Sequence, residues 1–179
     1  MAFAFPVDTT EAINEIRAGL KKKYHDARHH CYAWVLNPDG GAFKTSDDRE
    51  PSGTAGMPIF GQIRSRNLTN ILLVVVRYFG GIKLGTGGLA QAYKIAASDA
   101  LNKVTIIEKE VTEFLTLHYN YDATAEVMRF VGKFDLAIVD QSFGARCELK
   151  AALKVRNKKA ALDYLEQLKV LGVSVSPGT

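Results

Sequence analysis

The sequence predicts an α+β fold divided into two domains, residues 1–108 and 109–179. The first observation behind this is charge: residues 1–107 contain 13 basic and 9 acidic side chains, and residues 108–179 contain 10 of each, so the whole net charge of +4 lies in the first part. The second is the hydrophobic pattern, because long apolar runs are replaced by alternating apolar and polar residues beyond about residue 111. The third is length, since 179 residues can form two small domains.

Composition narrows the class of protein further. With 47% hydrophobic and 23% charged residues, the chain has the make-up of an ordinary globular protein. Its longest aliphatic run, Ile71 to Val76, is far shorter than the ~20 residues of a membrane-spanning helix, and Met1 to Val7 lacks the basic leader of an export signal. Two distant cysteines, Cys31 and Cys147, do not form a disulfide framework. We therefore expect a soluble, cytoplasmic protein without a membrane partner or a cofactor.

The first domain is expected to alternate helices and strands around one apolar strand. Asp8 and Glu11 have the spacing of a capping box, and apolar residues at helical spacing then continue to Tyr24, which predicts a helix. Residues 71–76 are apolar on both faces, which is typical of a central strand. The other predicted elements are strands at 31–36 and 42–45, a short helix at 57–65 and a helix at 89–102.

The second domain has a different order of elements. Apolar residues alternate with polar ones from Val111 to Tyr121, which predicts a strand with one wet face, and Asp122 can cap the helix that follows. The remaining elements are predicted as strands at 137–143 and 147–155, a helix at 161–171 and a strand at 173–175. This β-α-β-β-α-β order matches the ferredoxin-like split βαβ arrangement.

The segment from His25 to Cys31 contains five potential metal ligands in seven residues. However, His29, His30 and Cys31 are adjacent where a strand begins, so their side chains alternate between faces and cannot converge on one ion. We therefore predict no metal site. His29 and His30 either contact a ligand or lie in a surface loop, and Cys31 belongs to a buried strand, which disfavours it as a nucleophile.

An acidic, glycine-containing loop spans residues 46–56. Asp47, Asp48 and Glu50 have the side chains needed for paired acid–base catalysis or for holding Mg²⁺ through oxygen. Acids in a solvated loop need no ligand, so both interpretations stay open.

A glycine-rich segment joins the central strand to the helix predicted at 89–102. It lacks the Lys-Ser/Thr ending of a phosphate-binding P-loop, and its Gly85 lies too far from the strand for a dinucleotide-binding turn. Uncovered backbone N–H groups at a helix N-terminus nevertheless attract anions, which basic side chains nearby would reinforce. The alternative is that the glycines only permit a tight turn. The predicted anion- or nucleic-acid-binding residues are Arg64, Arg66, Arg77, Tyr78, Gly80, Gly81, Lys83, Gly85, Thr86, Gly87 and Gly88.

Three segments together carry a family resemblance. Ala27-Arg-His-His-Cys-Tyr-Ala-Trp34, Asp47-Asp-Arg-Glu-Pro-Ser-Gly-Thr-Ala-Gly56 and Val75-Val-Arg-Tyr-Phe-Gly-Gly-Ile-Lys-Leu-Gly-Thr-Gly-Gly-Leu89 resemble the IMPACT/YigZ family. The resemblance implies a ribosomal-protein-like N-terminal α/β sandwich, similar to domain IV of elongation factor G, and a ferredoxin-like C-terminal domain of the bacterial branch. It also implies a role in translation control: eukaryotic members compete for the activator of a stress-responsive initiation-factor kinase and bind actin monomers, and fold likeness suggests nucleic-acid binding for bacterial members.

The start of the chain departs from the family pattern. Family chains usually open with a strand carrying a Ser-Lys/Arg-Phe signature, and Met1 lies just after that point. Either Met1 is a misplaced start or the first strand is missing, and a missing strand would leave one sheet edge bare.

Three functional hypotheses follow. The first is a non-enzymatic binding protein of the translation apparatus whose partner is RNA or the ribosome, with a translation-related protein as a further partner. The second is a small-molecule or phosphate-ester enzyme that uses Asp47, Asp48, Glu50, His29 and Lys83. The third is a protein-interaction module.

Overall fold

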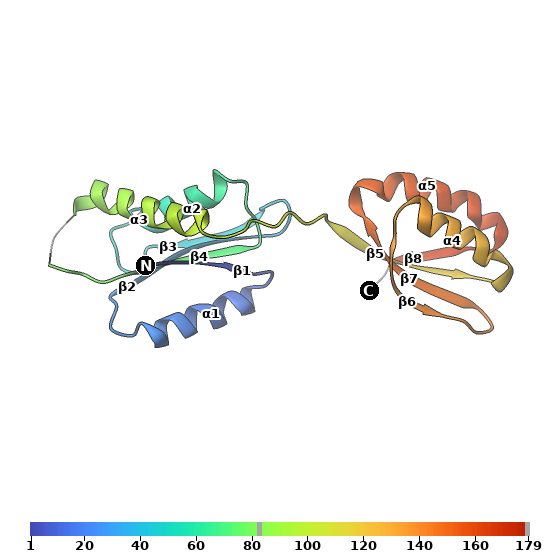
Figure 1. Cartoon of the computed structure of the whole chain (residues 1–179), viewed down its shortest axis with the longest axis horizontal. Coiled ribbons are helices and arrows are strands. Elements are labelled where there is room, and N and C mark those ends of the chain that lie inside the picture. Colours follow the sequence, from blue (N-terminus) through green and yellow to red (C-terminus); the bar gives the residue numbers. More distant parts are fainter. Residues whose placement is uncertain (82–83, 178–179) are drawn as a thin grey trace. The chain divides into compact units, whose positions relative to one another are not determined.

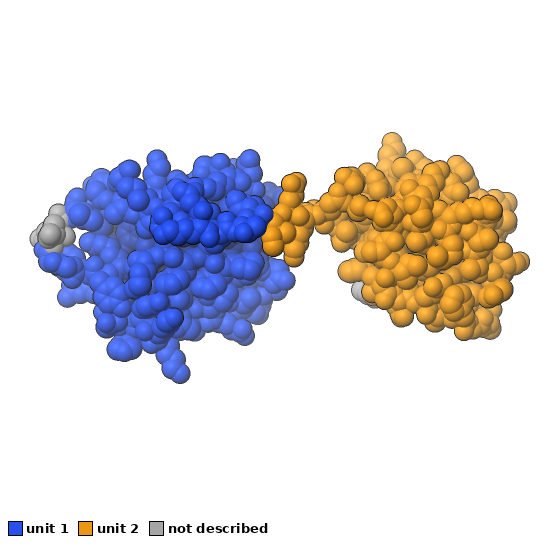
Figure 2. Space-filling view, in the orientation of Figure 1, with its two compact units in different colours: residues 1–106 blue, residues 107–179 orange. Residues whose placement is uncertain are grey.

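The computed structural model describes residues 1–81 and 84–177 and divides the chain into two compact units, residues 1–106 and 107–179 (Figure 2). Each unit contains one four-stranded antiparallel sheet, which confirms the predicted α+β class. The division falls two residues before the join that the sequence predicted.

The first unit has three layers. Its sheet has the strand order β1-β4-β2-β3, and α1 covers one face while α2 and α3 cover the other (Figure 1). Along the inner strands, successive apolar side chains point to opposite faces of the sheet, so they form a separate hydrophobic core on each side. The elements are β1 (Ala2–Pro6), α1 (Thr10–Lys23), β2 (His29–Leu36), β3 (Ala42–Ser46), α2 (Gly56–Arg64), β4 (Ile71–Arg77) and α3 (Gly85–Asn102).

Strand β4 is central, as its two apolar faces predicted. It pairs with β1 on one side and β2 on the other, both antiparallel. Leu73 and Val75 pack toward α2 and α3, whereas Leu72 and Val74 pack toward α1. This double burial fixes the register in which β2 and β4 meet.

The start of the chain corrects one expectation. Residues 2–6 form β1, which pairs with β4 from Ala2 opposite Val75 to Pro6 opposite Ile71. The place beside β4 that a missing strand would have left bare is therefore filled. Alternation explains the strand, because Ala4 packs toward α2 and α3, and Phe3 and Phe5 pack toward α1.

Two helices begin at different residues from those predicted. The N-cap of α1 is Thr9 and not Asp8, since the Thr9 hydroxyl accepts from the Ala12 N–H at 3.2 Å. Helix α3 begins at Gly85, four residues before the predicted Leu89. Glycine is a weak helix former, so the sequence favoured a loop there, but the tertiary context overrides that preference.

The second unit packs its helices on one face of its sheet. The strand order β6-β7-β5-β8, with both helices contributing to a single core, is the predicted βαββαβ arrangement. Short 3₁₀ turns at 121–123, 155–157 and 169–171 flank the helices. The elements are β5 (Thr112–Tyr119), α4 (Thr124–Lys133), β6 (Ala137–Ser142), β7 (Cys147–Lys154), α5 (Lys158–Leu168) and β8 (Ser174–Pro177).

Within residues 1–81 and 84–177, no helix combines the length and the apolarity that crossing a membrane would require.

Candidate functional site

Strand pairing brings the three sequence motifs to one end of the first sheet. His29, the first residue of β2, lies opposite Arg77, the last residue of β4. The acidic loop that follows β3 contacts the same end, because the Asp48 carbonyl oxygen accepts from His29 Nδ1 at 2.9 Å. Segments that are up to 48 positions apart in sequence, from 29 to 77, thus meet at a single location.

Asp47 is part of the scaffold. Its carboxylate accepts backbone N–H bonds from Gly53 at 2.9 Å, Ala55 at 2.9 Å and Gly56 at 2.8 Å. Partial burial raises the pKa of this carboxyl, but the three N–H donors outweigh it and hold the pKa below its usual value. The same bonds satisfy the start of α2, so Asp47 acts as a helix cap.

Asp48 and Arg49 form a strained turn. Their φ angles of 39° and 73° lie in the left-handed region, which non-glycine residues seldom adopt. The Asp48 carboxylate accepts from the backbone N–H of His30 at 2.7 Å, which holds the turn against β2. The turn directs the next side chain, Glu50, inward and leaves Arg49 exposed.

Glu50 is the buried acid of the site, with a side chain only 5% exposed. One of its oxygens accepts from Arg77 Nη1 and from the Tyr93 hydroxyl, both at 2.8 Å. His29 Nε2 lies 3.8 Å from the same oxygen. Burial, together with hydrogen bonds to Cys31 and Glu50, raises the pKa of Tyr93 well above its ordinary value.

Cys31 continues this network into the core. Its thiol donates to the Asp47 carbonyl oxygen at 3.0 Å, and the Tyr93 hydroxyl oxygen lies 3.3 Å from the same sulfur. Burial raises the pKa of the Cys31 thiol to about 12, so it stays protonated. This supports the sequence-based view that Cys31 is a poor nucleophile.

His30 lies on the opposite face of the sheet, near α1. Its side chain is 8% exposed, and Nε2 has no hydrogen-bond partner among the described residues. Burial lowers the pKa of His30, against the opposing effect of Asp48. Of the two histidines proposed as ligand contacts, only His29 reaches the site. Across residues 1–81 and 84–177, no three His, Cys, Asp or Glu side chains are grouped as a metal ion would require.

A cavity of about 370 Å³ opens beside this network. Three arginines line it, Arg28, Arg49 and Arg77. Phe79 lies among them, with the Cζ atoms of Arg28 and Arg77 each 5.6 Å from its ring centroid. The other lining residues are His29, Glu50, Pro51, Leu84, Gly85, Thr86 and Leu89.

The first turn of α3 forms one wall of the cavity. Its N-cap residue, Leu84, makes no side-chain capping bond, and no acidic residue occupies the first turn. The helix starts of α1 and α2, in contrast, are capped by Thr9 and Asp47. The first N–H groups of an uncapped helix start lack partners within the helix and favour an anion.

The structure separates the predicted basic residues. Arg77 lines the cavity, whereas Arg66 donates to Ser98 at 3.1 Å and to Asn102 at 2.8 Å, near the other end of α3. Ser98 is 13 residues from the helix start, which corresponds to roughly 20 Å along the axis. Arg64 lies over the Phe60 ring instead of beside the cavity.

The predicted glycines divide between a loop and a helix. Gly80 and Gly81 follow β4, Gly85 begins α3, and Gly87 and Gly88 continue its first turn with Thr86. The positive φ angles of 86° at Gly81 and 70° at Gly85 also fit the alternative that these glycines serve the turn itself. Tyr78 donates to Asp26 at 2.8 Å, and Lys83 lies outside the described residues.

Sequence reasoning missed Arg28, Arg49 and Phe79. Each belongs to one of the three motifs quoted above, but they are scattered in sequence and only strand pairing brings them together. Their residue types, two cations and an aromatic ring within the family motifs, were the available signal.

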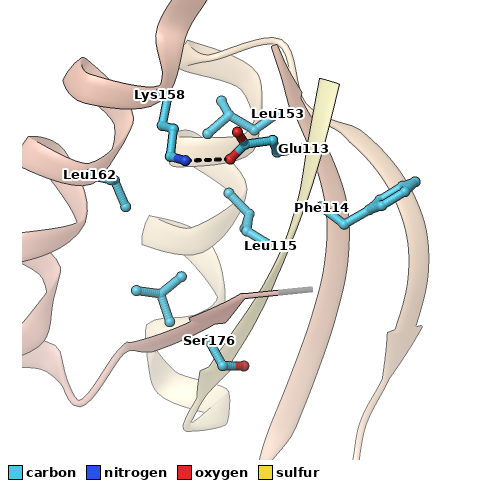
Figure 3. A pocket seen from close by; sticks show the side chains of 8 residues that line it. Glu113, Phe114, Leu115, Leu153, Lys158, Leu162 and Ser176 are labelled. Carbon is cyan, nitrogen blue, oxygen red and sulfur yellow. Dashed lines mark ion pairs between the residues drawn. The ribbon is translucent and has the colours of Figure 1, made fainter. Parts of the chain in front are cut away.

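The second unit contains a smaller cavity of about 240 Å³ (Figure 3). Its wall is mainly apolar, with Leu115, Leu153 and Leu162 beside one ion pair of 2.6 Å between Lys158 and Glu113. Since that pair is neutral overall, the arginine-lined cavity of the first unit is the stronger candidate for binding a charged ligand.

Comparison with known proteins gives consistent matches. Residues 1–101 match the Impact N-terminal domain. IMPACT family member YigZ of Escherichia coli is 37% identical over 82% of this chain and 72% of its own length. IMPACT family member YvyE of Bacillus subtilis is 29% identical over 90% and 75%, respectively. A solved structure, described as that of a hypothetical protein, aligns with a TM-score of 0.69 and 31% identity over 99% of this chain and 87% of the other.

Proposed function

The chain belongs to the IMPACT family, and on that premise we propose that it is a non-enzymatic RNA-binding protein of the translation apparatus. The proposed contact is between RNA phosphates and the arginine-lined cavity of the first unit. Phosphate contacts supply most of the affinity of such proteins and do not depend on sequence.

The observation that carries the proposal is the charge balance of the cavity. Arg77 is neutralised by Glu50 at 2.8 Å, the one carboxylate that lines the cavity among the described residues. Arg28 and Arg49 have no ion pair with a described carboxylate, and both are exposed. Two arginines without an ion pair to a described carboxylate therefore line the cavity, and guanidinium is well suited to bind phosphate through paired N–H donors.

The helix start adds to this charge. Gly85 and Thr86, in the first turn of α3, line the same cavity as the arginines, and the N-cap residue Leu84 makes no side-chain capping bond. The positive end of a helix dipole and backbone N–H donors together favour a phosphate at such a position.

The acids that an enzyme would need are already engaged. Asp47 accepts three backbone N–H bonds, and Glu50 accepts from Arg77 and Tyr93. A general acid or base must reach the substrate, and these carboxylates instead hold the loop in place. The geometry thus favours binding over turnover.

The test is RNA binding by the Arg28→Ala/Arg49→Ala double variant. We expect weaker binding to RNA of any sequence, measured by fluorescence anisotropy at 50 mM salt. Arg129→Ala/Arg156→Ala is a matched control, because these side chains of the second unit are 70% and 66% exposed and their loss also removes two positive charges. Co-sedimentation of the wild-type protein with ribosomes at low salt tests the translation assignment.

A further inference from the structure

The cavity has an apolar side that phosphate binding does not use. Phe79 and Leu84, which line it, are 39% and 46% exposed. Pro51 and Leu89 extend the apolar part of the wall. Exposed apolar side chains beside a cationic cavity indicate a ligand with both an anionic and an apolar part.

We propose that this ligand is a nucleotide with an unpaired base, so that the cavity selects single-stranded over duplex RNA. The proposal rests on the RNA-binding function above and names the part of the RNA that enters the site. Its phosphate binds Arg28, a neighbouring phosphate of the strand binds Arg49, and the base stacks on Phe79.

The distances support one nucleotide spanning both features. The Cζ atom of Arg28 lies 5.6 Å from the Phe79 ring centroid, so a phosphate on that guanidinium is close to the ring. Aromatic rings hold unpaired bases with little regard to sequence, because every base has a flat π face. Arginine planes beside the ring extend the stacking surface.

The size of the cavity points the same way. About 370 Å³ is near the lower end of the range for small-molecule sites, which suits one nucleotide unit. In a duplex the base faces are covered by their neighbours, so a duplex presents only its phosphates to the cavity. It therefore gains contacts with Arg28 and Arg49 but none with Phe79.

The experiment compares three ligands by anisotropy and competition: a six-nucleotide oligouridylate, a blunt-ended RNA duplex without unpaired bases, and uridine monophosphate. We expect Phe79→Ala and Phe79→Leu to weaken oligouridylate binding on the order of tenfold, since stacking is lost even where apolar volume is kept. Phe79→Trp should retain binding. Duplex affinity and the salt dependence of all three variants should stay unchanged, because the phosphate contacts remain.

Phe143→Ala is the matched control, since Phe143 is a 59% exposed phenylalanine of the second unit. Competition by uridine monophosphate would identify a free nucleotide as sufficient, whereas competition by the hexamer alone would assign the site to strands. If Phe79→Ala binds the hexamer as tightly as the wild type while Arg28→Ala/Arg49→Ala does not, base stacking is refuted and the phosphate site stands. If the arginine variant also binds normally, the proposed function itself fails.

Discussion

Replacing Arg28 and Arg49 by alanine removes two of the three arginines that line the cavity. Each phosphate neutralised on a single strand contributes about 0.7 to the slope of log K against log salt. Because Glu50 already neutralises Arg77, Arg28 and Arg49 together give a slope of about −1.4, which is a loss of roughly sevenfold between 50 and 200 mM salt. The double variant keeps only the neutralised Arg77, so its slope should be near zero and its affinity should change little over the same range.

The assay is fluorescence anisotropy of a labelled single-stranded RNA, titrated at several salt concentrations at constant pH. Arg77 is left in place because Glu50 depends on it, so that folding is not confused with binding. Circular dichroism should show that the double variant is folded. A folded variant with the wild-type slope would refute the assignment of the phosphates to this cavity.

Three other predictions concern folding and reactivity. Arg77→Ala should lower the free energy of unfolding by about 3 kcal/mol in urea titrations, since it leaves Glu50 buried without its cation. Replacing both partners, in the Arg77→Met/Glu50→Gln variant, should restore most of the lost stability. No recovery in that double variant would contradict the ion-pair argument. Gly56→Ala should destabilise the protein by roughly 1–3 kcal/mol, because the new Cβ would lie 2.8 Å from the Ser46 backbone nitrogen. Gly61→Ala in the same helix is the control: its Cβ would meet no atom within 4 Å, so it should stabilise the protein by about 0.5–1 kcal/mol. With a pKa of about 12, Cys31 should not react with a disulfide reagent at pH 8 until the protein is denatured; rapid labelling of the native protein would refute its burial.

Most of the fold could be predicted from the sequence, because the spacing of apolar residues along a helix or strand shows which of its faces is buried. Residues 71–76 are apolar at every position, and both faces of β4 are indeed covered. The start of α3 was not predictable in this way, since glycines at 85, 87 and 88 contradict helix propensity. Strand β1 was missed because five residues with a terminal proline carry little periodic signal.

The candidate site was predictable only in part. The glycine segment and Arg77 were found from their chemistry, but the sequence does not state which carboxylate an arginine faces. Asp47 and Glu50 illustrate the difficulty, because in the sequence both are simply acids in a loop. In the structure Asp47 caps α2, whereas Glu50 neutralises Arg77. Arg66 was placed beside the glycines because it follows the preceding helix, yet it bonds to Ser98 instead.

The arrangement of the loop at residues 46–56 explains how a motif with a net negative charge can present an exposed cation. The left-handed turn at Asp48 and Arg49 costs conformational energy, on the order of 1 kcal/mol per residue, and the hydrogen bonds of Asp47 and Asp48 offset it. As a result the acids of this loop point into the protein, toward backbone N–H groups and Arg77. Arg49, the loop's cation, remains exposed, and its Nη2 donates to the Arg28 carbonyl oxygen at 2.9 Å, which brings the two unpaired arginines together at the cavity. If the proposed function holds, the acids serve binding indirectly, because they hold Arg28 and Arg49 at the cavity.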